Sequence, residues 1–160
     1  MRRTICTVKP WVRQSHRPSL PEFIRMVTAA CKTLQRHLRG FIGRASQGDV
    51  EAQYNLAKMY ENQDSVLFDY SKAHSWYRLA ATNGHRGAQS RLGLLFEFGK
   101  GVAPSRVQAH MWYSIAFSNG NKAAAFWRDS LAGDLEPYEI LTAQILAQEC
   151  LSSRYHNCGG

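Results

Sequence analysis

The pattern of apolar positions predicts a chain built from amphipathic helices. Two stretches, beginning near Glu51 and near Arg86, place apolar residues three and four positions apart, as on one face of an α-helix. Two further stretches, at 73–80 and 109–116, show a similar spacing. The expected inward positions of the four helices are Ala52, Leu56 and Tyr60; Ala73, Trp76, Tyr77 and Ala80; Ala88, Leu92 and Phe96; and Ala109, Trp112, Tyr113 and Ala116.

The chain repeats itself at an offset of 36 residues. The segment AHSWYRLAATNG, residues 73–84, aligns with AHMWYSIAFSNG, residues 109–120, and seven positions are identical. Further identities lie upstream, where Ala52, Gln53, Leu56, Glu61 and Val66 match Ala88, Gln89, Leu92, Glu97 and Val102. A single helix pair cannot bury both of its faces, so successive pairs must stack. The repeat therefore predicts an all-α fold made of stacked helix pairs.

Glycines mark the predicted helix ends. Gly84 and Gly120 each follow an asparagine at the end of a second helix, where left-handed backbone is common. In the second unit Gly99 and Gly101 interrupt the chain, and Pro104 stands where a new helix can start. The first unit lacks both glycines, so we expect its loop to be stiffer or differently shaped.

The repeats also divide the chain into segments. A capping helix should precede the first unit, and a helix starting near Pro137 should close the array. We expect a basic, disordered leader at 1–19, a capping helix at 20–47, full repeats at 48–84 and 85–120, a partial third repeat with a capping helix at 121–151, and a flexible tail at 152–160.

The order of residues within each unit resembles the Sel-one-like repeat (SLR) family, whose members are α-helical solenoids related to tetratricopeptide repeats. The second unit carries Leu-Gly, Gly-x-Gly-Val and Trp-Tyr in the family's order, whereas the first departs at Gly-x-Gly. The resemblance implies a short right-handed α-α superhelix. It also implies a non-enzymatic adaptor or scaffold, often in bacterial pathways, with no shared catalytic site and no cofactor.

A binding face follows from this architecture, because the first helix of each pair usually lines the concave surface of a solenoid. We predict contacts with a protein or peptide partner at positions opposite the buried stripe. These positions are Tyr54, Asn55 and Lys58 in the first unit and Ser90, Arg91 and Leu94 in the second. Two full repeats are few for a solenoid, so self-association through an exposed end is a further expectation.

The formal net charge of +8 is concentrated at the start of the chain. Residues 1–44 hold ten Lys and Arg against one acid, Glu22, while the remainder is nearly neutral. A basic segment of this kind attracts nucleic acid or an acidic membrane surface. Binding of either through residues 1–44 is the alternative function.

Four cysteines, Cys6, Cys31, Cys150 and Cys158, form no CxxC pair, so we expect reduced thiols. No clear signal peptide or membrane-spanning run is visible, and we expect a cytoplasmic protein. A cysteine-rich branch of the SLR family, associated with β-lactam binding or hydrolysis, has cysteine pairs with seven residues between them in its repeats. Cys150 and Cys158 match that spacing once, at the chain end, which leaves this enzyme class a remote alternative.

His110, Trp112 and Tyr113 lie close enough in sequence to suggest a catalytic or stacking site. All three recur 36 residues earlier, which favours packing for the aromatic residues and the helix surface for the histidines, His74 and His110. No acidic residue or cysteine repeats with the histidines, so we expect no metal site. The search for function therefore turns to the first helix of each pair.

Overall fold

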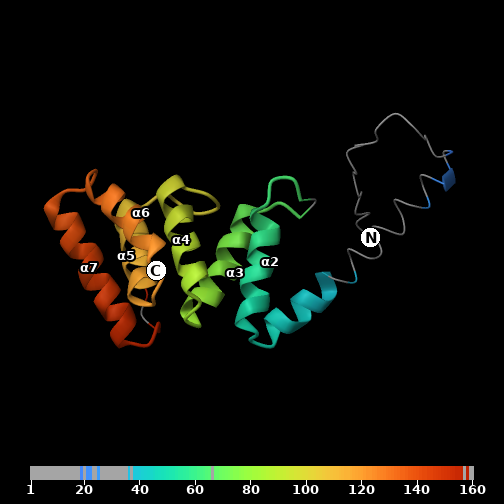
Figure 1. Ribbon diagram of the computed structural model, residues 1–160, viewed down its shortest axis with the longest axis horizontal. Coiled ribbons are helices and arrows are strands. Elements are labelled where there is room, and N and C mark those ends of the chain that lie inside the picture. The colour runs from blue at the N-terminus through green and yellow to red at the C-terminus, as the bar shows by residue number, and fades with distance from the viewer. Residues whose placement is uncertain are drawn as a thin grey trace.

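The computed structural model describes residues 19, 21–22, 25, 36, 38–65, 67–156 and 158, and among these it contains helices and turns but no β-strand. Residues 38–46 are helical. Six further helices follow, arranged side by side along the molecule (Figure 1). They are α2 (Val50–Glu61), α3 (Tyr70–Thr82), α4 (Arg86–Phe98), α5 (Arg106–Ser118), α6 (Ala123–Ala132) and α7 (Pro137–Ser152).

The helices pair and stack as the 36-residue repeat predicts. Helix α2 packs against α3 and α4 against α5, and contacts between α3 and α4 join the two pairs. The terminal helices are arranged differently, because both α6 and α7 pack mainly against α5. The result is an α-solenoid closed at one end by a terminal unit, which we define as α6 and α7.

Side chains at the start of each repeat helix fix where it begins. Asp49, Asp69 and Ser105 each accept a hydrogen bond from the backbone N–H three residues later, which satisfies a donor that the helix leaves free. His85 does the same for α4, with Nδ1 accepting from the Ala88 N–H at 3.0 Å. Pro137 opens α7, as predicted.

The core follows the apolar stripes for most of its length. The alanines of the four stripes are buried, and so are Leu56, Tyr77, Leu92 and Tyr113. Trp112 is 2% exposed, whereas its counterpart Trp76 is half-buried, as are Tyr60 and Phe96. The small alanines let the helices approach closely while the rings fill the space between them.

The glycines singled out in the sequence act at turns and do not belong to the core. Gly84, Gly101 and Gly120 are exposed, and all have positive φ angles. Gly101 is the most constrained, because a Cβ atom there would collide with the backbone of Tyr70 at the start of α3. The second repeat's loop therefore rests directly on the first repeat, and only glycine permits that contact.

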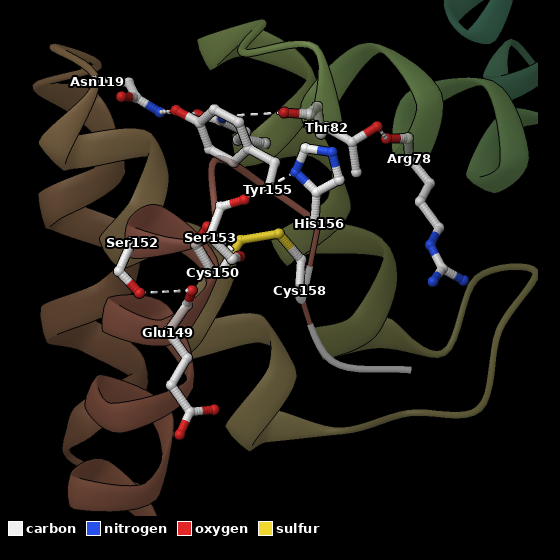
Figure 2. Close-up of a disulfide and its surroundings, with 12 residues drawn as sticks. Arg78, Thr82, Asn119, Glu149, Cys150, Ser152, Ser153, Tyr155, His156 and Cys158 are labelled. Atoms are coloured by element: carbon white, nitrogen blue, oxygen red, sulfur yellow. Dashed lines mark hydrogen bonds between the residues drawn. A yellow bond between two sulfur atoms is a disulfide. The ribbon is translucent and has the colours of Figure 1, made fainter.

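The chain after α7 differs from the flexible tail and the reduced thiols that we expected. Cys150 and Cys158 form a disulfide, and Cys158 is only 9% exposed (Figure 2). The backbone reverses after α7, where the Tyr155 N–H donates to the Cys150 carbonyl at 2.8 Å, and this turn returns Cys158 to the helix. The Tyr155 hydroxyl accepts a hydrogen bond from Asn119 at 2.8 Å, which fastens the tail to the end of α5.

Much of the N-terminal segment lies outside the described residues. All of the predicted leader at 1–19 except Ser19 falls there, as do Cys6, Cys31 and most of the basic residues of positions 1–44. Of the predicted capping helix, Leu38, Phe41 and Ile42 pack against Ala52 and Leu56 of the first repeat. Within the described part of the chain, no helix is both long and apolar enough to cross a bilayer.

Candidate functional site

A tyrosine–glutamate hydrogen bond ties the two helices of each repeat together. The Tyr77 hydroxyl donates to Glu61 and the Tyr113 hydroxyl to Glu97, both at 2.6 Å. Burial, reinforced by the nearby carboxylate, raises the pKa of both phenols far above the ordinary value of 10.0, so both remain donors. The offset alignment matched all four residues, but this bond was not foreseen.

A glutamine–asparagine chain joins one repeat to the next. Gln53 donates to the Ala45 carbonyl at 3.0 Å and accepts from Asn83 at 3.3 Å. The second repeat reproduces both bonds with Gln89, Ala81 and Asn119. Because both glutamines are buried, these bonds satisfy polar groups that would otherwise destabilise the stack.

Against this scaffold, α2 and α4 bring together a charged and aromatic surface, the α2–α4 face, formed by Glu51, Tyr54, Lys58, Glu61, His85 and Arg91. The Tyr54 ring stacks on the His85 ring with centroids 4.2 Å apart, and the Lys58 ammonium lies 5.6 Å from the Tyr54 centroid. His85 Nε2 lies 3.2 Å from Glu51 Oε2. Since Nδ1 of this ring accepts a backbone hydrogen bond, Nε2 is the nitrogen that donates to Glu51.

Arg91 crosses from α4 to α2. Its guanidinium lies 3.5 Å from Glu61, the same carboxylate that accepts the Tyr77 hydroxyl. The Arg91 side chain is still 42% exposed, so it can meet a partner while Glu61 holds it in place. The structure thus joins three of the predicted contact residues, Tyr54, Lys58 and Arg91, on one surface.

The other three predicted contact residues are half-buried, as Tyr54 and Arg91 also are. Asn55 is half-buried and donates to Glu51 at 3.3 Å, and Ser90 is also half-buried. Leu94 packs against the buried cluster of Ala109, Tyr113, Leu131 and Leu135, so it serves the interior as much as the surface. Glu51, Glu61 and His85 belong to the face and were missed, because apolar periodicity carries no information about polar partners.

A hollow of about 730 Å³ adjoins this face, where α2 and α4 begin. Its lining residues include Tyr54 and His85, together with Gly87 near the start of α4 and Asn121 in the loop before α6. The face carries two acidic side chains, Glu51 and Glu61, and two basic ones, Lys58 and Arg91, of which Arg91 pairs with Glu61. The surface suits a partner segment that itself mixes polar, charged and apolar groups.

His110 corrects a prediction. We expected a surface histidine, but the side chain is 3% exposed because α6 and α7 both cover α5. Burial lowers the pKa of His110 and of His74, and Arg128 and Arg78 respectively lower it further. Among the described residues, no group of three or more His, Cys, Asp and Glu is placed to hold a metal ion.

A second hollow, of about 560 Å³, lies among α5, α6 and α7 and is lined in part by His110. We call it the terminal pocket. Its other lining residues include Ser114 and Phe117 of α5, Arg128 and Ala132 of α6, and Gln144, Gln148 and Leu151 of α7.

The terminal unit also exposes large apolar side chains on its outer surface. Phe126 on α6 and Tyr138, Leu141 and Ile145 on α7 are each at least half exposed. In a longer solenoid a further repeat covers this position. Self-association through this end stays a prediction.

Comparison with known proteins agrees with the repeat architecture. A family model described as Sel1 repeat matches residues 50–85 and 87–121. A solved structure of a protective antigen from uropathogenic Escherichia coli, described as displaying an SLR fold, matches with a TM-score of 0.68 and 27% identity. That match covers 74% of this chain but only 26% of the antigen.

A Sel1 repeat protein from Oxalobacter formigenes is 28% identical, with a TM-score of 0.39 over 59% of this chain and 98% of that one. No curated protein matches this chain.

Proposed function

We propose, from the premise that this chain contains two Sel1 repeats in an SLR fold, that it is a non-enzymatic adaptor. In this proposal an extended segment of a partner protein lies along the α2–α4 face. The observation that carries the proposal is the convergence of Tyr54, Lys58 and Arg91, from two different helices, on one surface. Repeat proteins commonly use such a surface for binding.

The contacts within the face support binding without a large rearrangement. His85 holds the ring of Tyr54, and Glu61 holds the guanidinium of Arg91. Side chains already ordered in the free protein lose less conformational entropy when a partner arrives. Arginine and tyrosine are also among the residues that most often dominate the energy of protein interfaces.

The test is a pull-down with full-length protein from cells that express it, followed by mass spectrometry of the captured partners. The variant is Lys58→Glu combined with Arg91→Gln. Glutamine is chosen at position 91 because a new carboxylate there would face Glu61 and disturb the Tyr77 hydrogen bond. The proposal expects partners captured by the wild type to be lost from this variant.

The matched control combines Lys122→Glu with Arg106→Gln. Both residues are exposed and neither belongs to the α2–α4 face, and the pair changes the net charge by the same amount. Partners should remain bound to this control. Equal capture by both double variants, or equal loss from both, would contradict the assignment of the face.

The disulfide bears on where the adaptor works. Disulfides persist in oxidising compartments and are rare in the reducing cytosol. We therefore propose a compartment outside the cytosol in place of the cytoplasmic location expected from the sequence. Alkylation of intact cells, followed by mass spectrometry, should find Cys150 and Cys158 unreactive before reduction. Free thiols at both positions would restore the cytoplasmic assignment.

A further inference from the structure

The terminal pocket lies where α6 departs from the repeat. Helix α6 occupies the position of the first helix in a third repeat, and two residues fix its register. Ala124 and Leu131 stand 36 positions after Ala88 and Leu95, and they are 0% and 4% exposed. In this register the residue that corresponds to Phe96 is Ala132.

Phe96 has a specific role in the regular repeat, where it covers the histidine of the preceding second helix. Its ring meets the ring of His74 edge to face, with centroids 5.4 Å apart and an interplanar angle of 87°. The histidine 36 residues later is His110, and the residue placed to cover it is Ala132. Both His110 and Ala132 line the terminal pocket, beside the position that a phenyl ring fills one repeat earlier, and His110 offers the pocket only a small part of its surface because it is 3% exposed.

The surroundings of this space are polar but carry little net charge. The Arg128 guanidinium lies 4.9 Å from the Phe117 centroid and pairs with Asp129 at 2.7 Å. Gln144 and Gln148, both exposed, supply neutral amide groups from α7. His110 Nδ1 is buried and has no hydrogen-bond partner among the described residues. A charged occupant would find no unpaired opposite charge here, and a neutral ring needs none.

We propose that the terminal pocket binds an aromatic side chain of a partner protein, seated against His110 as Phe96 is seated against His74. This proposal rests on the proposed function only in that the partner is a protein. The ring supplies the edge-to-face contact that Ala132 cannot make, and such contacts favour an aromatic side chain over an aliphatic one of similar size. The amides of Gln144 and Gln148 bind the main chain on either side of the ring.

The experiment titrates ¹⁵N-labelled full-length protein with two neutral peptides, acetyl-Gly-Gly-Phe-Gly-Gly-amide and the same peptide with Leu in place of Phe. Backbone amide shifts report where each peptide binds. The phenylalanine peptide should shift the amides of His110, Ala132 and Gln144 and should bind about fivefold more tightly than the leucine peptide. No shift at these residues, or equal affinity for both peptides, would overturn the proposal.

Ala132→Phe is the decisive variant, because it restores the ring of the regular repeat and should abolish these shifts. Ser130→Phe adds the same ring at an exposed position of α6 and should leave binding intact. If Ala132→Phe fails to fold, Gln148→Glu at the exposed rim should weaken binding of the neutral peptide instead. Unchanged binding in the folded Ala132→Phe variant, or in Gln148→Glu, would overturn the proposal.

The outcomes separate this inference from the proposed function. A cellular partner lost by Lys58→Glu with Arg91→Gln but retained by Ala132→Phe would overturn the pocket and leave the α2–α4 face. Peptide shifts that vanish in Ala132→Phe, with partner capture unaffected by the Lys58 and Arg91 changes, would support the pocket and overturn the α2–α4 face. Pocket shifts that depend on protein concentration without peptide would assign the pocket to a second copy and overturn the proposal.

Discussion

The second repeat and the terminal unit begin with helices in the same register, α4 and α6. These two helices place different side chains against the second helix of the preceding repeat. Helix α4 presents Leu92 and Phe96, which pack into the stack, whereas α6 presents Arg128 and Ala132 at the same positions. Both helices keep the small alanine near the start and the buried leucine near the end. The comparison teaches that a few periodic residues are enough to dock a helix, and that the positions released from packing are free to form a site.

Trp112→Ala should have the largest effect on the free energy of unfolding, about 3–5 kcal/mol, because the ring is 2% exposed. The matched change Trp76→Ala removes a half-buried ring and should cost less. Urea denaturation of both variants measures the difference. Equal costs would mean that the second repeat is no more tightly covered by the terminal unit than the first is by its neighbours.

Removing the disulfide with Cys158→Ser should lower the free energy of unfolding by about 2–3 kcal/mol, the value expected for a disulfide that closes a short loop. The hydrogen bond between Tyr155 and Asn119 should weaken with it, because the disulfide holds the tail in place. Denaturation with and without reductant provides the control, since reductant should have no effect on the variant. A variant as stable as the wild type would show that the tail contributes nothing to the cap.

Tyr113→Phe should cost about 1.5–3 kcal/mol, because it removes a hydrogen bond to the carboxylate of Glu97. Tyr77→Phe should cost less, because Glu61 keeps the guanidinium of Arg91 after the phenol is lost. Adding Arg91→Gln to Tyr77→Phe should raise the loss of stability in the first repeat to that of Tyr113→Phe in the second. A double variant no less stable than Tyr77→Phe alone would contradict this role for Arg91.

The smallest expected effect is on pH dependence. Burial lowers the pKa of His74 and His110 in the folded protein, so the unfolded chain takes up protons first as the pH falls through 6.5. The stability that these histidines contribute is complete above that pH and declines below it. The pKa values of Asp49 and Asp69 lie below 3.8, so those groups act only in stronger acid.

Denaturation between pH 7.5 and pH 5 measures this decline, and His110→Gln should make it shallower. An identical slope in the variant would mean that His110 is not kept neutral by its burial.

The sequence predicted the helix pairs, their stacking and the packed faces, because each depends on apolar residues that recur at fixed intervals. The start of α7 also followed from a local signal, Pro137. The glutamine–asparagine chain and the tyrosine–glutamate bonds were visible only as identities, because identity alone does not say which side chains meet.

The residues of the proposed binding face were harder to predict. Lys58 and Arg91 follow from helix geometry, but the pairing of Arg91 with Glu61 depends on how two helices cross. The burial of His110 depends on α6 and α7 both packing on α5, which the repeat pattern does not specify. The missing ring at Ala132 was the one signal within reach, since the 36-residue offset continues into α6.

A crystal structure of Ala132→Phe tests the account most directly, because it asks whether the terminal unit is a repeat that lacks one ring. The account predicts that the new phenyl ring fills the terminal pocket and meets His110 edge to face, as Phe96 meets His74, with α6 and α7 unmoved. A ring turned out to solvent, or a displaced α6, would contradict it.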